Sequence, residues 1–298
     1  MIRKSDTVEN LDVKQIEVNL LLEAIYQRYG YDFRQYSRAS IQRRLLNHLA
    51  KTEFETISDL IPEILHDETV FASLVGDLSV TVTEMFRDPW FYLALREKVI
   101  PFLKTFPFIN IWHAGCATGE EVYSLAILLK EEGLYDRAQI YATDFNDTVL
   151  EKAQARIYPL ERIKEYSLNY QKAGGHGSLA DYYRASYQSV ILDASLQDNI
   201  TFANHNLATD GVFSEMHLIL CRNVLIYFDR ALQNRVLTIF RDSLCYNGFL
   251  GLGSKETLHF SSVKGDFVRF AAKEKIYQCK KFSEPLGQPV SLTSIDNG

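Results

Sequence analysis

Residues Ile111-Trp-His-Ala-Gly115-Cys-Ala-Thr-Gly119-Glu-Glu121 form an apolar run that leads into a turn bracketed by two glycines. Glycine suits backbone that turns tightly or approaches a ligand closely, and a helix that begins after such a turn presents unpaired N–H groups. The pattern therefore predicts a strand, a ligand-binding turn and a helix. Many strand-to-helix turns contain two glycines for conformational reasons alone, so the surrounding sequence has to decide.

Beyond Phe108 the pattern alternates between strands and helices, which is typical of a mainly parallel sheet covered by helices, an α/β fold. We expect strands at Ile109–Ala114, Gln139–Asp144, Ile200–Ala203, His217–Cys221, Phe249–Gly253 and Lys275–Cys279. The expected helices are Glu120–Glu132, Asp147–Ile157 and Arg230–Cys245. The connection over 159–199 is far longer than an ordinary loop, and alternation at Tyr187, Ser189 and Ile191 predicts an antiparallel hairpin within this insertion.

Upstream, apolar residues recur at three- and four-residue spacing, which predicts an all-helical domain over residues 1–78. Its helices are expected from Val13 to the stop at Gly30, then at Arg38–Lys51, Ile57–Leu65 and Thr69–Leu78. The buried face of the first should hold Ile16, Leu20, Leu21, Ala24 and Ile25. Residues 79–107 are expected to form a linker and a connecting helix ending near Pro101, followed by the sheet domain over 108–282 and a disordered tail over 283–298.

Composition narrows the class of protein. The 298 residues carry a net charge of −6, which disfavours a general nucleic-acid binder, and no apolar run approaches the roughly 20 residues of a membrane span. Without an apolar leader at the N-terminus, we expect a cytoplasmic protein, and we expect a monomer. The four cysteines and seven histidines are scattered, so no metal is expected. The helix with Arg38, Arg43 and Arg44 is locally basic, either as an ordinary solvated face or as a docking face for an acidic helical partner.

Polar residues cluster where the predicted parallel strands end, which is where open α/β sheets bind ligands. Asp144 closes the second strand about 25 residues after the glycine turn, a position from which a carboxylate can accept hydrogen bonds from ribose hydroxyls. The turn lacks the glycine spacing for a pyrophosphate, and Glu120 and Glu121 stand where a phosphate would sit. A cationic or zwitterionic nucleoside fits better, and S-adenosylmethionine (SAM) is such a ligand.

Six segments together are similar to the CheR family of chemotaxis protein methyltransferases: Thr83–Asp88, Ala114–Ser124, Thr143-Asp144, Leu150–Tyr158, Asn206-Leu207 and Cys221-Arg-Asn-Val-Leu-Ile-Tyr-Phe228. The likeness runs in order from about Leu20 to Lys280. It implies an N-terminal helical domain, a linker, and a Rossmann-like SAM-dependent methyltransferase domain with a small inserted β-subdomain. The implied activity is methyl transfer from SAM to glutamate side chains on helical cytoplasmic regions of chemoreceptors, which yields methyl esters and S-adenosylhomocysteine.

The resemblance also implies roles for particular residues. Cofactor contacts are expected from Thr81, Thr83, Arg87, Glu120, Asp144, Asn206, Leu207, Cys221 and Arg222, and the turn at Gly115 should cradle the amino-acid end of SAM. Arg87 would pair with the cofactor carboxylate, and Glu120 with its ammonium group. Tyr227, Arg222 and Arg87 are the expected catalytic residues, with Tyr227 beside the reacting methyl. The alternatives are a surface ion pair for Arg87, a core position for Tyr227, a turn cap for Asn206 and a buried small residue at Cys221.

This chemistry needs no general base, because a glutamate carboxylate with a pKa of about 4.3 is already an anion at neutral pH. Alignment and exclusion of water should supply most of the catalysis. Four features depart from enteric members of the family: Thr81 stands in place of an asparagine, Val122 in place of a proline, and Gly115-Cys116 in place of a run of small residues. The fourth is the insertion, which carries Gly174-Gly-His-Gly177 and a tyrosine-rich run. Receptor-tail binding by the insertion is therefore not assumed. A SAM-binding regulatory or scaffold protein and a methyltransferase for another substrate are the rival hypotheses.

Overall fold

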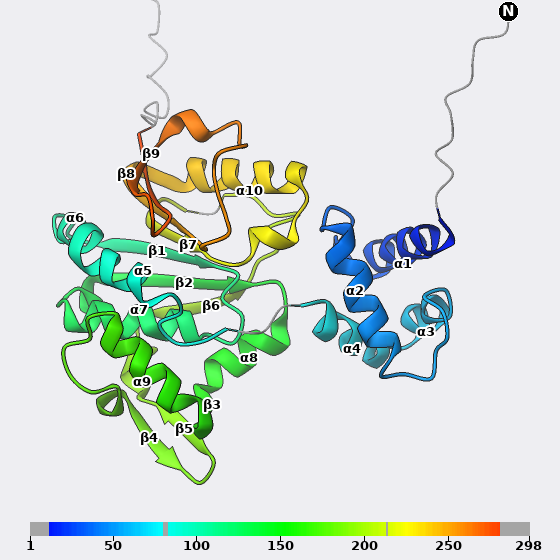
Figure 1. The fold of residues 1–298 in the computed structure, drawn as a ribbon, viewed down its shortest axis with the longest axis horizontal. Coiled ribbons are helices and arrows are strands. Elements are labelled where there is room, and N and C mark those ends of the chain that lie inside the picture. Colours follow the sequence, from blue (N-terminus) through cyan, green and yellow to red (C-terminus); the bar gives the residue numbers. More distant parts are fainter. Residues whose placement is uncertain (1–11, 80–82, 213, 281–298) are drawn as a thin grey trace, which may run out of the picture.

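The computed structural model describes residues 12–79, 83–212 and 214–280, arranged as a helical module and a sheet domain (Figure 1). The helical module contains α1 (Val13–Tyr29), α2 (Arg38–Leu49), α3 (Leu60–His66) and α4 (Glu68–Leu78). Gly30 ends α1 in the left-handed conformation, with φ of 76°, as its position in the sequence predicts. Residues 1–11, Thr81 and the tail expected at 283–298 lie outside the described residues.

The buried face of α1 differs from the predicted one. Val18, Leu21, Leu22 and Ile25 are buried in the core of the helical module, whereas Ile16 and Leu20 are 44% and 55% exposed. Apolar residues surround more than half of this helix, but only one stripe of it can pack against the other helices. Spacing alone cannot select the stripe, because two overlapping sets satisfy the same periodicity.

The connecting helix is longer than predicted and irregular. It runs through α5 (Pro89–Ala94), a π-helical turn η1 (Leu95–Val99) and α6 (Ile100–Leu103). The backbone N–H of Ile100 bonds to the carbonyl of Leu95, five residues earlier. Pro101 follows this π-helical turn directly, in the first turn of α6, and the helix continues past the proline to Leu103.

The sheet domain is built on seven strands in the order β6-β2-β1-β7-β8-β10-β9 (Figure 1). Their bounds are β1 Ile109–Ala114, β2 Ala138–Asp144, β6 Ile200–Asn204, β7 Met216–Cys221, β8 Leu244–Leu252, β9 Phe267–Ala271 and β10 Ile276–Cys279. Neighbouring strands from β6 to β8 pair in parallel, and β10 pairs antiparallel with β8 and β9. The first five strands thus follow the doubly wound order, which confirms the predicted α/β class.

Helices cover both faces of this sheet. The helices α7 (Glu120–Glu131), α8 (Asp147–Ala155) and α10 (Arg230–Ser243) follow β1, β2 and the β7 loop. Alternate residues of β1 divide between two cores: Ile111 packs with α7, and Trp112 packs with α10. Short helical turns η2 Tyr135–Arg137, η3 Leu160–Arg162, η4 Leu179–Tyr182, η5 Ala194–Leu196, η6 Leu225–Tyr227 and η7 Lys264–Asp266 complete the connections. No described helix is both long enough and apolar enough to cross a membrane.

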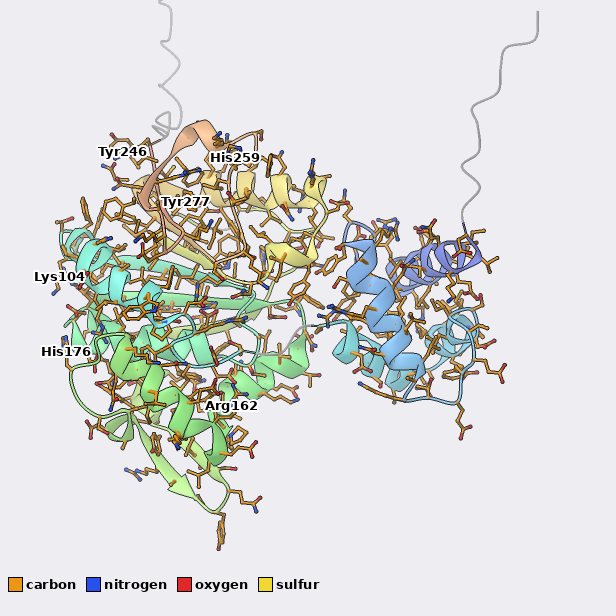
Figure 2. All side chains as sticks on the ribbon, in the orientation of Figure 1. Lys104, Arg162, His176, Tyr246, His259 and Tyr277 are labelled. Carbon is orange, nitrogen blue, oxygen red and sulfur yellow. The ribbon has the colours of Figure 1, made fainter. Side chains whose placement is uncertain are left out.

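The insertion contains the predicted hairpin and two further elements. Strands β4 (Tyr183–Ser186) and β5 (Ser189–Leu192) form the hairpin, and Tyr187 occupies its turn with φ of 52°. Strand β3 (Ile157–Pro159) pairs with β5, so α8 ends two residues before the predicted Ile157. Helix α9 (Ile163–Lys172) was not predicted. Arg162, at the start of α9, lies where the insertion leaves the sheet domain (Figure 2).

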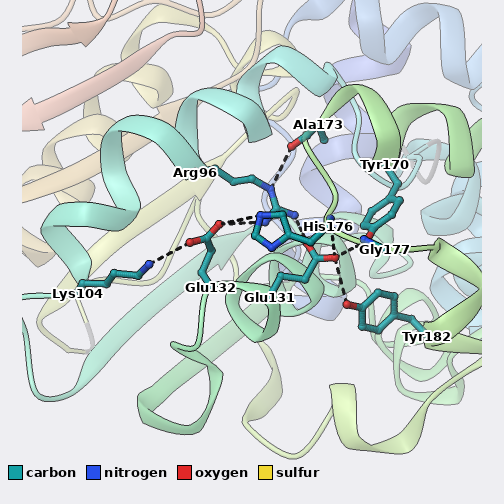
Figure 3. A network of polar contacts seen from close by, with 9 residues as sticks. All are labelled: Arg96, Lys104, Glu131, Glu132, Tyr170, Ala173, His176, Gly177 and Tyr182. Carbon is teal, nitrogen blue, oxygen red and sulfur yellow. Dashed lines mark hydrogen bonds and ion pairs between the residues drawn. The ribbon is translucent and has the colours of Figure 1, made fainter.

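A buried polar network ties the insertion to α7 and the connecting helix (Figure 3). Glu131 accepts hydrogen bonds from the hydroxyls of Tyr170 and Tyr182 and pairs with buried Arg96. Arg96 also donates to the carbonyl of Ala173, at 3.1 Å. Because each of these groups is satisfied by a partner from another element, the network fixes the insertion beside the sheet.

Candidate functional site

A cavity of about 380 Å³ opens at the carboxyl ends of β1, β2 and β7, where the sheet domain meets the helical module. The residues lining it from the helical module include Tyr36, Ser40, Ile41 and Arg44, and those from the sheet domain include Gly115, Asp144, Leu207, Arg222 and Tyr227. A pocket of several hundred Å³ at this edge of a parallel sheet is the usual ligand site of the fold.

The glycine turn forms one wall of the cavity. Gly115 has φ of 77°, and a Cβ atom added to it would lie 2.5 Å from Cγ2 of Val224. The N–H groups of Gly115 and Cys116 both donate to the carbonyl of Thr143, which holds the turn against β2. Gly119, with φ of 90°, then begins α7. Both glycines are therefore required by backbone conformation and close packing.

Asp144 faces the cavity at the end of β2. Its carboxylate accepts the N–H of Ala117 at 3.0 Å and that of Asn146 at 3.1 Å, so two loops fix its orientation. Burial raises the pKa of Asp144, and the backbone N–H groups oppose that rise. With two oxygens and about four acceptor sites, the carboxylate keeps capacity for hydroxyl donors from a ligand.

Of the two adjacent glutamates at the start of α7, Glu121 lines the cavity and Glu120 does not. Glu120 is buried outside the set of residues lining the cavity, and the hydroxyl of Thr118 donates to it at 2.6 Å. Burial raises the pKa of Glu120 to about 7. Glu121 lines the cavity and forms a buried ion pair with Arg222. Glu121 is therefore the acidic residue that sequence reasoning missed, although it stands next to the predicted one.

Arg222 lies between two carboxylates. Besides Glu121 it pairs with Asp88 at 2.6 Å, and its guanidinium stacks 4.2 Å from the centre of the Phe91 ring. The buried guanidinium is thus paired with one buried carboxylate, Glu121, and one partly exposed carboxylate, Asp88. This arrangement leaves the group little freedom to bind an incoming carboxylate, the role the sequence suggested. Asp88 was not among the predicted site residues, although it closes the motif Thr83–Asp88, the one sequence signal that could have found it.

The linker brings Thr83 and Arg87 to the cavity. Arg87 forms no hydrogen bond or ion pair with any residue that the structure describes, so its charge is available to an anionic ligand group. Thr81, the third predicted linker contact, falls in the undescribed segment 80–82. Among the described residues Arg87 has no ion-pair partner within 4 Å, although its positive charge opposes the rise in the pKa of nearby Glu84.

Asn206 and Cys221 are placed differently from Leu207, which does line the cavity. The side chain of Asn206 accepts the N–H of Ala208 at 2.9 Å and so caps a turn. Cys221 is fully buried at the end of β7 among core residues. Neither residue lines the cavity, and the contacts of both are compatible with the conformational alternative.

Tyr227 is held at the junction of the two modules. Its carbonyl accepts the N–H of Ser37 at 2.7 Å, and the N–H of Asp229 donates to the carbonyl of Gln35 at 2.8 Å. These two bonds flank an antiparallel bridge between Tyr36 and Phe228, whose rings lie 4.9 Å apart. The helical module therefore supplies part of the cavity, a contribution that no local sequence pattern signals.

Arg44 covers Tyr227 from the helical module. Its guanidinium lies 5.3 Å from the ring centre of Tyr227 and donates to the carbonyls of Asp77 and Ser79. Arg38 and Arg43, from the same basic helix, are exposed. The basic surface thus divides into one residue that lines the cavity and two that face outward.

The residues present fit SAM. At Gly115 there is no room for a Cβ atom, which suits a turn whose backbone approaches a ligand closely. The carboxylate of Asp144 can accept hydrogen bonds from the ribose hydroxyls, and the guanidinium of Arg87 can pair with the carboxylate of the cofactor. The extra negative charge of Asp88 and Glu121 around Arg222 also suits a ligand that carries a positive sulfur.

Comparisons with known proteins identify the family of the chain. A family model described as "CheR methyltransferase, SAM binding domain" matches residues 81–275, and one described as "CheR methyltransferase, all-alpha domain" matches residues 16–79. Cher3 of Pseudomonas putida is 52% identical over 88% of this chain and 96% of its own length. "Chemotaxis protein methyltransferase 2" of Pseudomonas aeruginosa is 33% identical over 68% of this chain and 70% of that protein. The "Chemotaxis protein methyltransferase" of Borreliella burgdorferi is 29% identical over 84% of this chain and 90% of that protein. The chain therefore belongs to the CheR family of SAM-dependent methyltransferases.

Proposed function

We propose that this protein transfers a methyl group from SAM to glutamate side chains of a chemoreceptor or a related signalling protein, giving glutamate methyl esters. The observation that carries the proposal is the composition of the cavity: polar groups of the sheet domain such as Asp144 line it together with Tyr36 of the helical module and Arg44 of its basic helix α2. A small-molecule methyltransferase has no need of that module. Relatives named chemotaxis protein methyltransferases support the same class of substrate.

SAM, when bound, supplies a methyl group already activated by a positively charged sulfur. The residues of this chain then hold the cofactor and orient it toward the acceptor carboxylate. We assign Asp144 to the ribose, Arg87 to the carboxylate of the cofactor, and Glu120 to its ammonium group. Glu120 would reach that group by a change of side-chain conformation, because in the structure it bonds to Thr118.

Tyr227 and Arg44 are the groups that we assign to the incoming glutamate carboxylate. Both line the cavity, and the hydroxyl of a tyrosine and the fork of an arginine can each donate to a carboxylate oxygen. Arg44 also has its own position fixed by two backbone carbonyls, which lowers the cost of ordering it. Because the carboxylate arrives ionised, no residue has to remove a proton from it.

Arg222 takes a positioning role in this scheme. Its bonds to Glu121 and Asp88 join α7 to the residue that precedes α5, so the pair of carboxylates fixes the floor of the cavity. Removing the guanidinium would leave Glu121 buried and unmatched, and the floor would rearrange.

The exposed residues Arg38 and Arg43 form the docking surface that we propose for the protein substrate. They lie on the same helix as Arg44, so an acidic helical region of a cytoplasmic signalling protein bound there would place its glutamates over the cavity mouth. Complementary charge of this kind speeds association and selects partners. We expect the enzyme to act as a cytoplasmic monomer.

The test is to incubate the protein with methyl-labelled SAM and a receptor from the same cell, and to ask whether label is released as methanol in mild base. Release of label, together with its loss when the acceptor glutamates are changed to glutamine, is the expected result. Asp144→Asn should abolish labelling and serves as the negative control. A protein that binds SAM with ordinary affinity yet labels no receptor would be a scaffold, and the proposal would be wrong.

A further inference from the structure

Glu256 is a buried carboxylate that belongs to neither the motifs nor the cavity lining. It lies in the loop after β8 and is 4% exposed. Four backbone N–H groups converge on it: those of Asn223 at 3.1 Å, Val224 at 2.9 Å, Ile226 at 3.4 Å and Gly253 at 2.6 Å. Three of these four belong to a single segment, the loop that follows Arg222.

That segment carries functional groups at both ends. Arg222 precedes it, Tyr227 closes it, and Val224 within it packs against the glycine turn at Gly115. Asn223 has φ of 62°, which turns successive N–H groups toward a single point and creates a small anion-binding concavity. The carboxylate of Glu256 fills that concavity.

The fit between the two loops is close. A Cβ atom on Gly253 would lie 2.7 Å from the nitrogen of Asn223 and 2.8 Å from Oε2 of Glu256, so only glycine allows the loops to approach this far. Among the described residues, no Lys, Arg or His forms an ion pair with Glu256. Its negative charge is therefore balanced by backbone N–H groups alone, which makes it a rigid and directional anchor.

We propose that Glu256 is the positioning residue of the catalytic loop: its carboxylate holds Asn223–Ile226 so that Tyr227 faces the cavity. This inference rests on the proposed methyl transfer, in which Tyr227 orients the acceptor carboxylate. The loop is held at three places: by Glu256, by the bond from Ser37 to Tyr227 at the helical module, and by the side-chain amide of Gln233 on α10, which donates to the carbonyls of Leu225 and Phe228 at 2.9 and 3.0 Å. Of the two side chains, only Glu256 binds the backbone N–H groups of the loop.

The test compares Glu256→Gln with Glu256→Asp. Glutamine keeps the shape of the side chain but replaces one acceptor oxygen with an NH₂ group that faces N–H donors. Aspartate keeps the charge and loses one methylene. We expect kcat for receptor methylation to fall by roughly tenfold to a hundredfold in Glu256→Gln, less in Glu256→Asp, and the Kd for S-adenosylhomocysteine to change by less than about threefold.

Glu131→Gln is the matched control, because Glu131 is also a buried carboxylate that accepts a backbone N–H, that of His176, but none of its partners lines the cavity. It should lower thermal stability and leave kcat intact. Wild-type turnover in Glu256→Gln, or a lower kcat in Glu256→Asp than in Glu256→Gln, would show that shape rather than charge holds the loop and would overturn the proposal.

Hydrogen exchange separates this inference from the proposed function, because it requires no turnover. The amides of Val224 and Ile226 should exchange about tenfold faster in Glu256→Gln, whereas the amides of β1 should exchange at the wild-type rate. Unchanged exchange at Val224 and Ile226 refutes the anchor whatever the substrate is. Faster exchange in an enzyme that methylates no receptor would support the anchor and refute the proposed function instead.

Discussion

Glu120 is predicted to make the stability of the protein depend on pH. Burial raises its pKa from the ordinary 4.5 to about 7, so the folded protein binds the proton more tightly than the unfolded chain does. The resulting stabilisation is fully present below pH 4.5 and is lost as the pH rises to 7 and above. At 1.36 kcal/mol per pH unit, the loss amounts to about 3 kcal/mol.

The perturbation is Glu120→Gln, which stays neutral and can still accept the hydrogen bond from Thr118. The variant should be about 3 kcal/mol more stable than the wild type at pH 8 and within about 1 kcal/mol of it at pH 5. Urea unfolding of both proteins at pH 5, 6, 7 and 8 measures the difference. Glu151→Gln, which changes an exposed carboxylate on α8, is the control and should follow the wild-type curve.

Ligand binding tests the assigned role of the same carboxylate. If Glu120 binds the ammonium group of the cofactor, the Kd of S-adenosylhomocysteine should rise about tenfold from pH 8 to pH 6 in the wild type, because the ionised fraction falls by that factor. The Kd of Glu120→Gln should be weaker at pH 8 and should change less with pH. His205 also lines the cavity, so the difference between the two proteins is the quantity to compare. Parallel stability curves, or equal pH dependence of Kd, would refute the reasoning.

Three further variants test other parts of the site. Gly115→Ala should lower the free energy of unfolding more than Gly133→Ala does, and it should also weaken S-adenosylhomocysteine binding. Both glycines have positive φ, but nothing lies within 4 Å of a Cβ at Gly133, so the difference between the two variants in calorimetry measures the clash with Val224. Glu121→Gln should lower the free energy of unfolding by about 3 kcal/mol, because it leaves buried Arg222 with one carboxylate; a change below about 1 kcal/mol in urea unfolding would contradict this. Arg43→Glu should raise the KM for the receptor severalfold without changing cofactor affinity; equal KM values would exclude docking there.

Much of the sheet domain could be predicted from the sequence because its central strands are continuous apolar runs. The bounds of β1 are those expected, and β2 and β7 differ from expectation by one residue at the start. The edge strand β9 was missed, since Arg269 interrupts its short apolar segment and its middle residues are largely exposed. Helix α9 was missed because it packs against the connecting helix, which lies some 70 residues away in the sequence, and no local pattern shows that contact.

Some residues of the site could likewise be predicted from local sequence, and others could not. Asp144, Arg87 and Gly115 line the cavity as expected, because each stands at the end of a strand or in a motif that local sequence defines. Which of Glu120 and Glu121 faces the cavity could not be read from the sequence, since adjacent helical residues point about 100° apart and only packing fixes the rotation of α7. The pairing of Asp88 with Arg222 joins residues 134 positions apart, so no local pattern contains it.

The junction at Tyr36 and Phe228 has a consequence for how this protein can change during evolution. Its two bonds join main-chain atoms, Ser37 to Tyr227 and Asp229 to Gln35, which are the same for nearly every amino acid. Side chains in both segments can therefore be replaced freely as far as these bonds are concerned, with proline at Ser37 or Asp229 excluded because it lacks the N–H. A one-residue insertion or deletion, by contrast, would shift the pairing and turn Tyr36 or Tyr227 away from the cavity. Chain length, more than residue identity, is what natural variation must preserve here.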